Sequence, residues 1–191
     1  MRAKFFLSCI TVSLAALTMP AFSQAEYRIL GSYTLGGDGG WDYLNLDPAT
    51  GNLFITRGSH VMVVDPASGK QLADISGLQG IHGTAFVGDR AYVSEGGADR
   101  IAVIDTKNLS KISEIAVGAR PDGILFDPVS KRIFTFNGTS KDATAVDPVS
   151  GKAVGTVALG GKPEAAVSDG AGTIFVNIED KSELVASTPK L

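Results

Sequence analysis

The stretch ILFDPVSKRIFTF, residues 124–136, decides the fold. Two apolar runs rich in Ile, Leu and Phe flank a polar centre that begins with Asp-Pro. An aspartate that accepts backbone N–H groups, followed by a proline with its fixed φ, favours a tight turn. Short apolar runs on both sides of such a turn are typical of a β-hairpin. The stretch therefore predicts two short antiparallel strands.

The same pattern returns along the chain with a period of about 40 residues. One series reads LNLDPATGNLFIT (44–56), AFVGDRAYVS (85–94), ILFDPVSKRIFTF (124–136) and AVSDGAGTIFV (166–176). A second series follows it and reads VMVVDPASGK (61–70), IAVIDTKNLSK (101–111), ATAVDPVSGK (143–152) and the divergent LVASTPKL (184–191). Two independent series with one period predict a repeat architecture.

Each full period contains four short apolar runs separated by turn residues. We expect strands over roughly 42–47, 52–57, 60–65, 70–75; 82–87, 90–95, 100–105, 111–117; 122–127, 132–137, 142–147, 152–159; 164–168, 173–178 and 182–187. Four antiparallel strands per repeat of this length are typical of a propeller blade. The sequence predicts an all-β protein, a β-propeller with about four four-stranded blades at 38–77, 78–118, 119–160 and 161–191.

The recurring aspartates of both series lie at the expected turns. Their side chains are suited to accept N–H groups of the residues that follow them. We therefore assign a turn-forming role to Asp47, Asp65, Asp105, Asp127 and Asp147.

The segment YRILGSYTLGG (27–37) matches the fourth strand of a blade, KAVGTVALGG (152–161). It is expected to form a lone outer strand, while residues 161–191 supply only the first three strands of a blade. Two explanations are open. The chain is the first part of a longer propeller, or the N-terminal strand completes the fourth blade and closes a four-bladed ring without free edges.

Residues 1–25 have the pattern of a secretory signal peptide. A short basic start precedes the apolar run FFLSCITVSLAALTM (5–19), Pro20 ends it, and small residues occupy Ser23 and Ala25. The run is too short for a comfortable membrane span, which leaves an uncleaved anchor helix as the alternative. We expect cleavage after Ala25, no stable membrane insertion afterwards, and a periplasmic or secreted domain over 26–191.

Composition narrows the classes of partner. Cleavage would remove Cys9, the only cysteine, together with two of the 17 basic residues and none of the 20 acidic ones, which leaves a net charge of −5. An exported domain without cysteine has no disulfide. The negative charge argues against nucleic-acid binding by counterion release and against docking on an anionic membrane.

The repeats resemble the YVTN-type (YncE-like) β-propeller family of exported bacterial proteins. The stretches RIAVIDTKNLSK and RIFTFNGTSKDATAVDPVSGK carry the resemblance, and the second-strand motif returns as AYVSE (91–95), IFTFN (133–137) and IFVNI (174–178). The resemblance implies a seven-bladed propeller about twice as long as this chain, and so favours a truncated propeller. It implies binding of small molecules, DNA or partner proteins, without a single activity.

Four polar residues open the first strands of the repeats. Asp42, His82, Asp122 and Glu164 are spaced 40, 40 and 42 residues apart. Because the first strand of a blade lies beside the central channel, we expect these side chains to form a ring at its mouth. Three carboxylates and one imidazole suit a divalent cation or a cationic ligand. The alternative is that each faces solvent or caps backbone amides.

Two further features border this ring. Trp41, the sole tryptophan, precedes Asp42, and we interpret it as core packing under the first blade, with a stacking wall at the channel mouth as the alternative. The loops between second and third strands, at 56–60, 94–100, 137–142 and 177–183, are polar but vary in charge, so we interpret them as a solvated face, with a recognition surface that varies from blade to blade as the alternative.

No motif for nucleophilic catalysis, phosphate binding or zinc binding is present in the sequence, and no catalytic residue is assigned. We expect a non-enzymatic protein that binds a small ligand, a cation or a partner protein at the channel mouth, with a divalent cation as the one cofactor that the ring suits. A metal-dependent hydrolase of lactonase type is the alternative, and DNA binding is a third hypothesis.

Overall fold

The structure, a computed structural model, describes residues 27–188, so the predicted signal peptide lies outside the described residues. The chain divides into two units, Met1–Ser32 and Tyr33–Leu191. The described part of the first unit, residues 27–32, contains no helix or strand. No helix within residues 27–188 combines the length and the apolar character needed to cross a bilayer.

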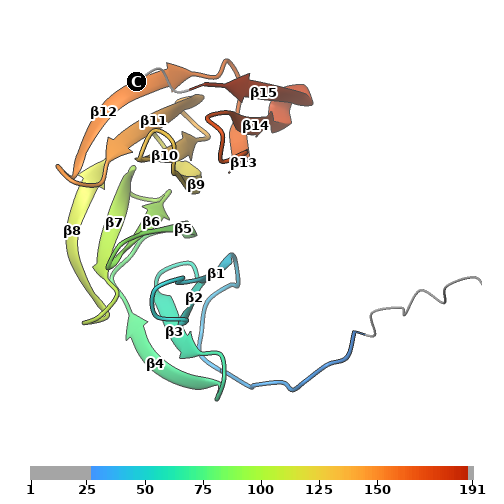
Figure 1. The fold of residues 1–191 in the computed structure, drawn as a ribbon, viewed down its shortest axis with the longest axis vertical. Coiled ribbons are helices and arrows are strands. Elements are labelled where there is room, and N and C mark those ends of the chain that lie inside the picture. Colours follow the sequence, from blue (N-terminus) through green and yellow to red (C-terminus); the bar gives the residue numbers. More distant parts are fainter. Residues whose placement is uncertain (1–26, 189–191) are drawn as a thin grey trace, which may run out of the picture. The chain divides into compact units, whose positions relative to one another are not determined.

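The second unit consists of four antiparallel sheets in sequence order (Figure 1). The first two contain β1 (Leu44–Leu46), β2 (Leu53–Thr56), β3 (Val61–Asp65), β4 (Lys70–Ile75), and β5 (Ile81–Val87), β6 (Arg90–Glu95), β7 (Arg100–Asp105), β8 (Ser110–Ala116). The last two contain β9 (Pro121–Asp127), β10 (Arg132–Asn137), β11 (Asp142–Asp147), β12 (Lys152–Ala158), and β13 (Pro163–Ser168), β14 (Ile174–Ile178), β15 (Glu183–Ser187), with a short 3-10 turn at Glu179–Lys181. This confirms the predicted fold, a partial β-propeller of about four blades.

The turn aspartates have the predicted role. Ala49 N–H donates to Asp47 Oδ1 at 3.0 Å, and Thr50 Oγ1 donates to Asp47 Oδ2 at 2.6 Å. The equivalent bonds hold the turns after Asp65, Asp105, Asp127 and Asp147. Hydrogen bonds from the Ser68 hydroxyl and the Ala67 amide lower the pKa of Asp65, because they stabilise its ionised form.

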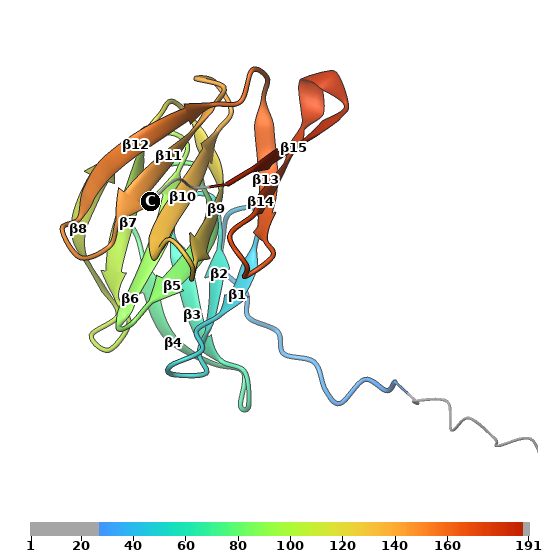
Figure 2. The same ribbon diagram turned by 45° about the horizontal axis from the view of Figure 1, so that its top comes forward.

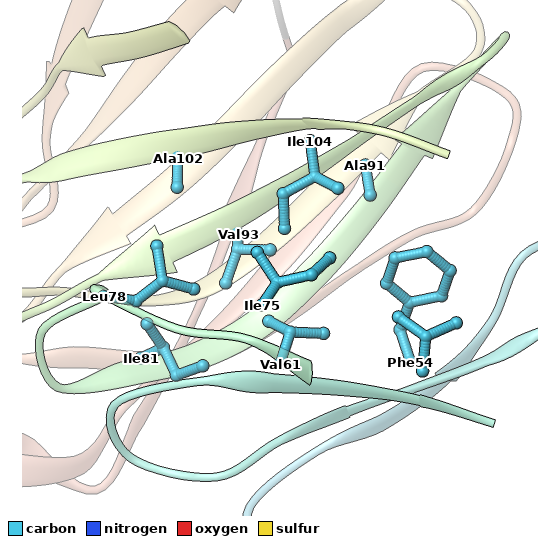
Figure 3. Close-up of a cluster of buried hydrophobic side chains, with 10 residues drawn as sticks. Phe54, Val61, Ile75, Leu78, Ile81, Ala91, Val93, Ala102 and Ile104 are labelled. Atoms are coloured by element: carbon cyan, nitrogen blue, oxygen red, sulfur yellow. The ribbon is translucent and has the colours of Figure 1, made fainter. Parts of the chain in front are cut away.

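The hydrophobic core lies between consecutive sheets. Between the first and second sheets, Phe54, Val61 and Val63 pack with Ile81, Val93, Ala102 and Ile104, as Figure 3 shows for all of these except Val63. The rings of Phe54 and Phe86 meet edge to face at 5.2 Å. Each fully buried aliphatic or aromatic side chain of this kind contributes about 1.5–3 kcal/mol, so the sheets are held together mainly by these layers.

The N-terminal segment differs from the prediction. None of residues 27–37 belongs to a strand, and the last sheet has the order β13-β14-β15 without a fourth strand (Figure 2). Within the second unit, Leu35 instead packs against the first sheet, and Tyr33 Oη donates to Ala67 O at 2.8 Å. A strand needs an edge to pair with, and residues 33–37 lie across the face of the first sheet rather than along an edge.

Candidate functional site

The first strands of the blades approach each other closely. β5 lies against β9, and β9 lies against β13. Two glycines permit this contact: a Cβ on Gly123 would overlap with the backbone carbonyl of Glu164, and a Cβ on Gly83 would lie 2.9 Å from Ile124 Cγ2. Each glycine follows one of the predicted site residues in the sequence. The close approach therefore draws Asp122 towards His82.

A pocket of about 190 Å³ lies between the first strands. Each first strand or the residue before it contributes two residues to the pocket. Tyr43 precedes β1 and Asn45 lies on it, and β5, β9 and β13 contribute Gly83, Thr84, Gly123, Ile124, Ala165 and Ala166. This agrees with the expectation that the first strands border a central channel. The pocket walls from β5, β9 and β13 are mostly small residues.

His82 lies between two carboxylates of the predicted ring. Its Nδ1 is 2.7 Å from Asp42 Oδ2 and 3.8 Å from Asp122 Oδ1, and all three side chains are about one third exposed. Burial raises the pKa of Asp122; the charge of His82 lowers it, and that of Asp42 raises it further. The ionised form of Asp122 is therefore disfavoured where no further cation neutralises it.

Glu164 has a different partner. The carboxyl group of Glu179, followed by burial, raises the pKa of Glu164. Lys162 Nζ forms an ion pair with Glu179 and a hydrogen bond joins them. Within residues 27–188, no three or more His, Cys, Asp or Glu side chains are grouped so that they could hold a metal ion. The structure thus joins Asp42, His82 and Asp122, and leaves Glu164 with Glu179.

Tyr43 belongs to this mouth, although sequence reasoning missed it. Burial raises the pKa of its phenol, and the negative charges of Asp122, Asp42 and Glu164 raise it further. The phenol therefore lies within electrostatic range of three of the four predicted site residues. Its only signal in the sequence is its position after Asp42, since the other repeats have Gly83, Gly123 and Ala165 there.

The interpretation of Trp41 as core packing is wrong, because 56% of its surface is exposed. The guanidinium carbon of Arg57 lies 4.4 Å from the centroid of its ring, at cation–π distance. Arg57 is itself buried and donates to three carbonyl oxygens, those of Gly36 at 2.6 Å, Gly37 at 3.2 Å and Gly39 at 3.0 Å. The arginine therefore fixes the glycine-rich segment that leads to Asp42.

The loops between second and third strands are less solvated than expected. Thr56, Glu95 and Asn137 end β2, β6 and β10, and all three are fully buried. Glu95 accepts from Gln79 N–H and from Arg100 at 3.1 Å each, while Asn137 Nδ2 donates to Asp142 and Thr144. The solvated-face interpretation fails for these residues, because their side chains are buried and form hydrogen bonds within the protein.

Comparison of the sequence with family models finds no match, and no curated protein matches it either. Solved structures do match. Hydrazine synthase from Kuenenia stuttgartiensis aligns with a TM-score of 0.68 and 21% identity over 78% of this chain and 45% of its own. The WD40 β-propeller domain of Doa1 gives a TM-score of 0.66 and 13% identity over 78% of this chain and 51% of its own.

A protein of unknown function from Bacteroides caccae aligns with a TM-score of 0.62 and 16% identity, over 80% of this chain and 59% of its own. At these identities the likeness shows the fold, which is that of a β-propeller. This chain spans about half the length of the structures it matches.

Proposed function

We propose that this chain is an exported binding protein of the YVTN propeller type, which takes a small organic cation at its channel mouth. The observation that carries the proposal is the placement of His82 between Asp42 and Asp122, three residues that come from three successive repeats. Glu164 adds negative charge at the same mouth, since it acts on the phenol of Tyr43 together with both aspartates.

The charge at this mouth favours a positively charged guest. Asp122 is partly buried, and burial raises its pKa. Its negative charge therefore lacks sufficient stabilisation when the mouth is empty. An ammonium or guanidinium group placed beside it would stabilise the carboxylate by a charge-assisted hydrogen bond. The adjoining pocket, with the small residues Gly83, Gly123 and Ala165 in its wall, leaves room for the carbon skeleton of such a ligand.

Binding can be followed through Trp41, the only tryptophan, which is exposed and precedes Asp42. The purified protein is titrated with putrescine, agmatine and choline, and with succinate as an anion of similar size. We expect the cations to change the tryptophan emission with saturation and succinate to leave it unchanged. Calorimetry on the same pairs gives the affinity independently.

Asp122→Asn should weaken binding of the best cation about tenfold, or about 1.4 kcal/mol. The matched control is Asp89→Asn, which removes the same charge in the turn at the other end of β5, where Asp89 pairs with Lys107. Equal affinities for the two variants would contradict a role for the mouth, and saturation by succinate alone would contradict the preference for cations.

A further inference from the structure

One face of the fourth sheet has no neighbour within the described chain. Phe54, Tyr92, Phe134 and Phe175 occupy the same repeat position, and each pairs across its hairpin with the equivalent residue of the third strand. The first three are buried, with 0%, 1% and 6% exposure, because the next sheet packs against them. Phe175 is only partly buried.

The residues around Phe175 show the same difference. Leu184 on β15 is 70% exposed, whereas its equivalents Val61, Ile101 and Ala143 are buried against the next sheet. Val167 on β13 is 61% exposed, and its equivalent Ala85 is buried. With Ala165, Ala166 and Asn177, these side chains line a shallow apolar depression. We call the surface formed by Val167, Phe175 and Leu184 the open face.

The opposite end of the second unit carries the complementary surface. Ile55, Met62 and Val64 on the first sheet are the repeat equivalents of Val93, Ala102 and Ile104, three residues of the face by which the second sheet packs on the first. Leu35 packs on this face of the first sheet. Leu78 and Leu159, the repeat equivalents of Leu35, fill the same place between two sheets. This face of the first sheet thus carries the same kind of apolar residues as the face by which the second sheet packs on the first.

We propose that two copies of this chain associate head to tail, with the open face of each packed against the first sheet of the other. Two copies of four sheets each would close a ring of eight blades with two-fold symmetry, without an unpaired end. The proposal stands independently of the ligand at the channel mouth.

The segment 27–37 gives the arrangement a second contact. It matches the fourth strand of a blade in sequence and is followed by the first strand of its own first sheet, just as β12 is followed by β13. In the ring, this segment of one copy would pair with the free edge of β15 in the other and complete its fourth blade. By repeat alignment with β11 and β12, where Thr144 pairs with Thr156, Ser32 of one copy would lie opposite Val185 of the other, since Val185 is the equivalent of Thr144.

The mass in solution tests the association. Protein expressed from the full reading frame is measured by light scattering after size exclusion, and we expect the mass of two copies. Leu184→Asp and, separately, Phe175→Lys should give the mass of one copy, with β-sheet circular dichroism retained. Val149→Asp is the matched control, because Val149 is 90% exposed in the turn before β12, away from the open face. It should leave the mass at two copies.

Cross-linking tests the geometry. In a Cys9→Ser background, chains with Ser32→Cys are mixed with chains with Val185→Cys and oxidised, and we expect a disulfide-linked pair. Val149→Cys in place of Val185→Cys should give none. A wild-type protein that is monomeric, a pair of copies that survives both open-face variants, assemblies larger than two copies, or the absence of the Ser32–Val185 link would each overturn the proposal.

Discussion

The imidazole of His82 lies 2.7 Å from the carboxylate of Asp42, although 40 residues separate them in the chain. The cause is their separation by one repeat of the propeller, since Asp42 lies just before the first strand of its blade, His82 lies at the start of the next first strand, and these strands run side by side. The next repeat adds Asp122, whose carboxylate lies 3.8 Å from the same imidazole nitrogen. Residues at equivalent positions of three repeats thus form one cluster of charged side chains.

Asp122→Asn should stabilise the ligand-free protein at neutral pH. Burial and the charge of Asp42 raise the pKa of Asp122 in the folded state despite the opposing effect of His82, so the folded state holds this proton more tightly than the unfolded state does. The stability linked to Asp122 is therefore full below its ordinary pKa and is lost as pH rises through the raised pKa. The gain should be below about 1 kcal/mol, because the group is partly exposed.

Urea unfolding at pH 3.5 and pH 7 measures this effect. We expect the variant to be more stable than the wild type at pH 7 and to lose that advantage at pH 3.5. Asp89→Asn, at an exposed ion pair with Lys107, serves as the control and should show no gain at pH 7. A loss of stability for Asp122→Asn at pH 7 would mean that its contact with His82 outweighs the burial of its charge.

Arg57→Met should destabilise the first blade. The guanidinium donates to the carbonyls of Gly36, Gly37 and Gly39, and methionine keeps an unbranched apolar stem but removes all three bonds. Hydrogen bonds to charged groups contribute about 1.5–3 kcal/mol each, and leaving buried acceptors unpaired adds to the loss, so we expect at least about 2 kcal/mol.

The readout is double. Urea unfolding reports the stability, and the emission of Trp41 should change because the guanidinium leaves its ring face. Arg132→Met is the control, since Arg132 is partly exposed and its contact with Asp147 is 3.7 Å long. A wild-type emission spectrum in Arg57→Met would show that the stacking does not persist in solution.

The fold could be predicted because its determinants are local and repeated. The Asp-Pro turn of ILFDPVSKRIFTF, read once, gives a hairpin, and its recurrence gives the blades. The limits of the strands follow closely, with β1 as the main difference: it covers Leu44–Leu46 instead of 42–47. There the Thr56 hydroxyl takes part in the pairing with Tyr43, which interrupts the regular ladder.

The candidate site could be predicted only in part. The equivalent positions of Asp42, His82 and Asp122 in three repeats predicted that they lie together. Repeat position does not predict contacts with side chains from other segments, such as the interaction of Glu164 with Glu179. The burial of Glu95 was missed because its partners, Gln79 in the loop before β5 and Arg100 at the start of β7, occupy positions whose residues differ between the repeats. The exposure of Trp41 was missed because it depends on Arg57, which lies 16 residues further along the chain.

Gly123→Ala should be strongly destabilising. A Cβ at this position would overlap with the backbone carbonyl of Glu164 on the neighbouring first strand, and backbone cannot move aside as a side chain can. Overpacking of this kind costs about 1–3 kcal/mol, and it would also widen the mouth. Gly83→Ala should cost less, because its nearest neighbour is a side-chain methyl group of Ile124.

Gly155→Ala provides the control for this pair. It lies on β12 with no atom near the position of a new Cβ, and the alanine restricts the unfolded chain, so it should be neutral or stabilising by up to about 1 kcal/mol. Thermal unfolding of the three variants gives the ranking. An unchanged melting temperature in Gly123→Ala would mean that the first strands are further apart in solution.

Glu95 and Glu114 should differ sharply in their effect, although both bind Arg100. Glu95 is fully buried and contacts the guanidinium at 3.1 Å, whereas Glu114 is 40% exposed in its side chain and contacts it at 2.7 Å. Glu95→Ala leaves Gln79 N–H and one side of the guanidinium without their acceptor, and breaking a buried pair costs about 3–5 kcal/mol. Glu114→Ala should cost below about 1 kcal/mol, as exposed pairs do.

Urea unfolding at low and at 1 M salt separates the two cases, because screening should abolish the effect of Glu114→Ala and leave that of Glu95→Ala. Equal costs for the two variants would contradict the predicted difference between the buried and the exposed contact of Arg100.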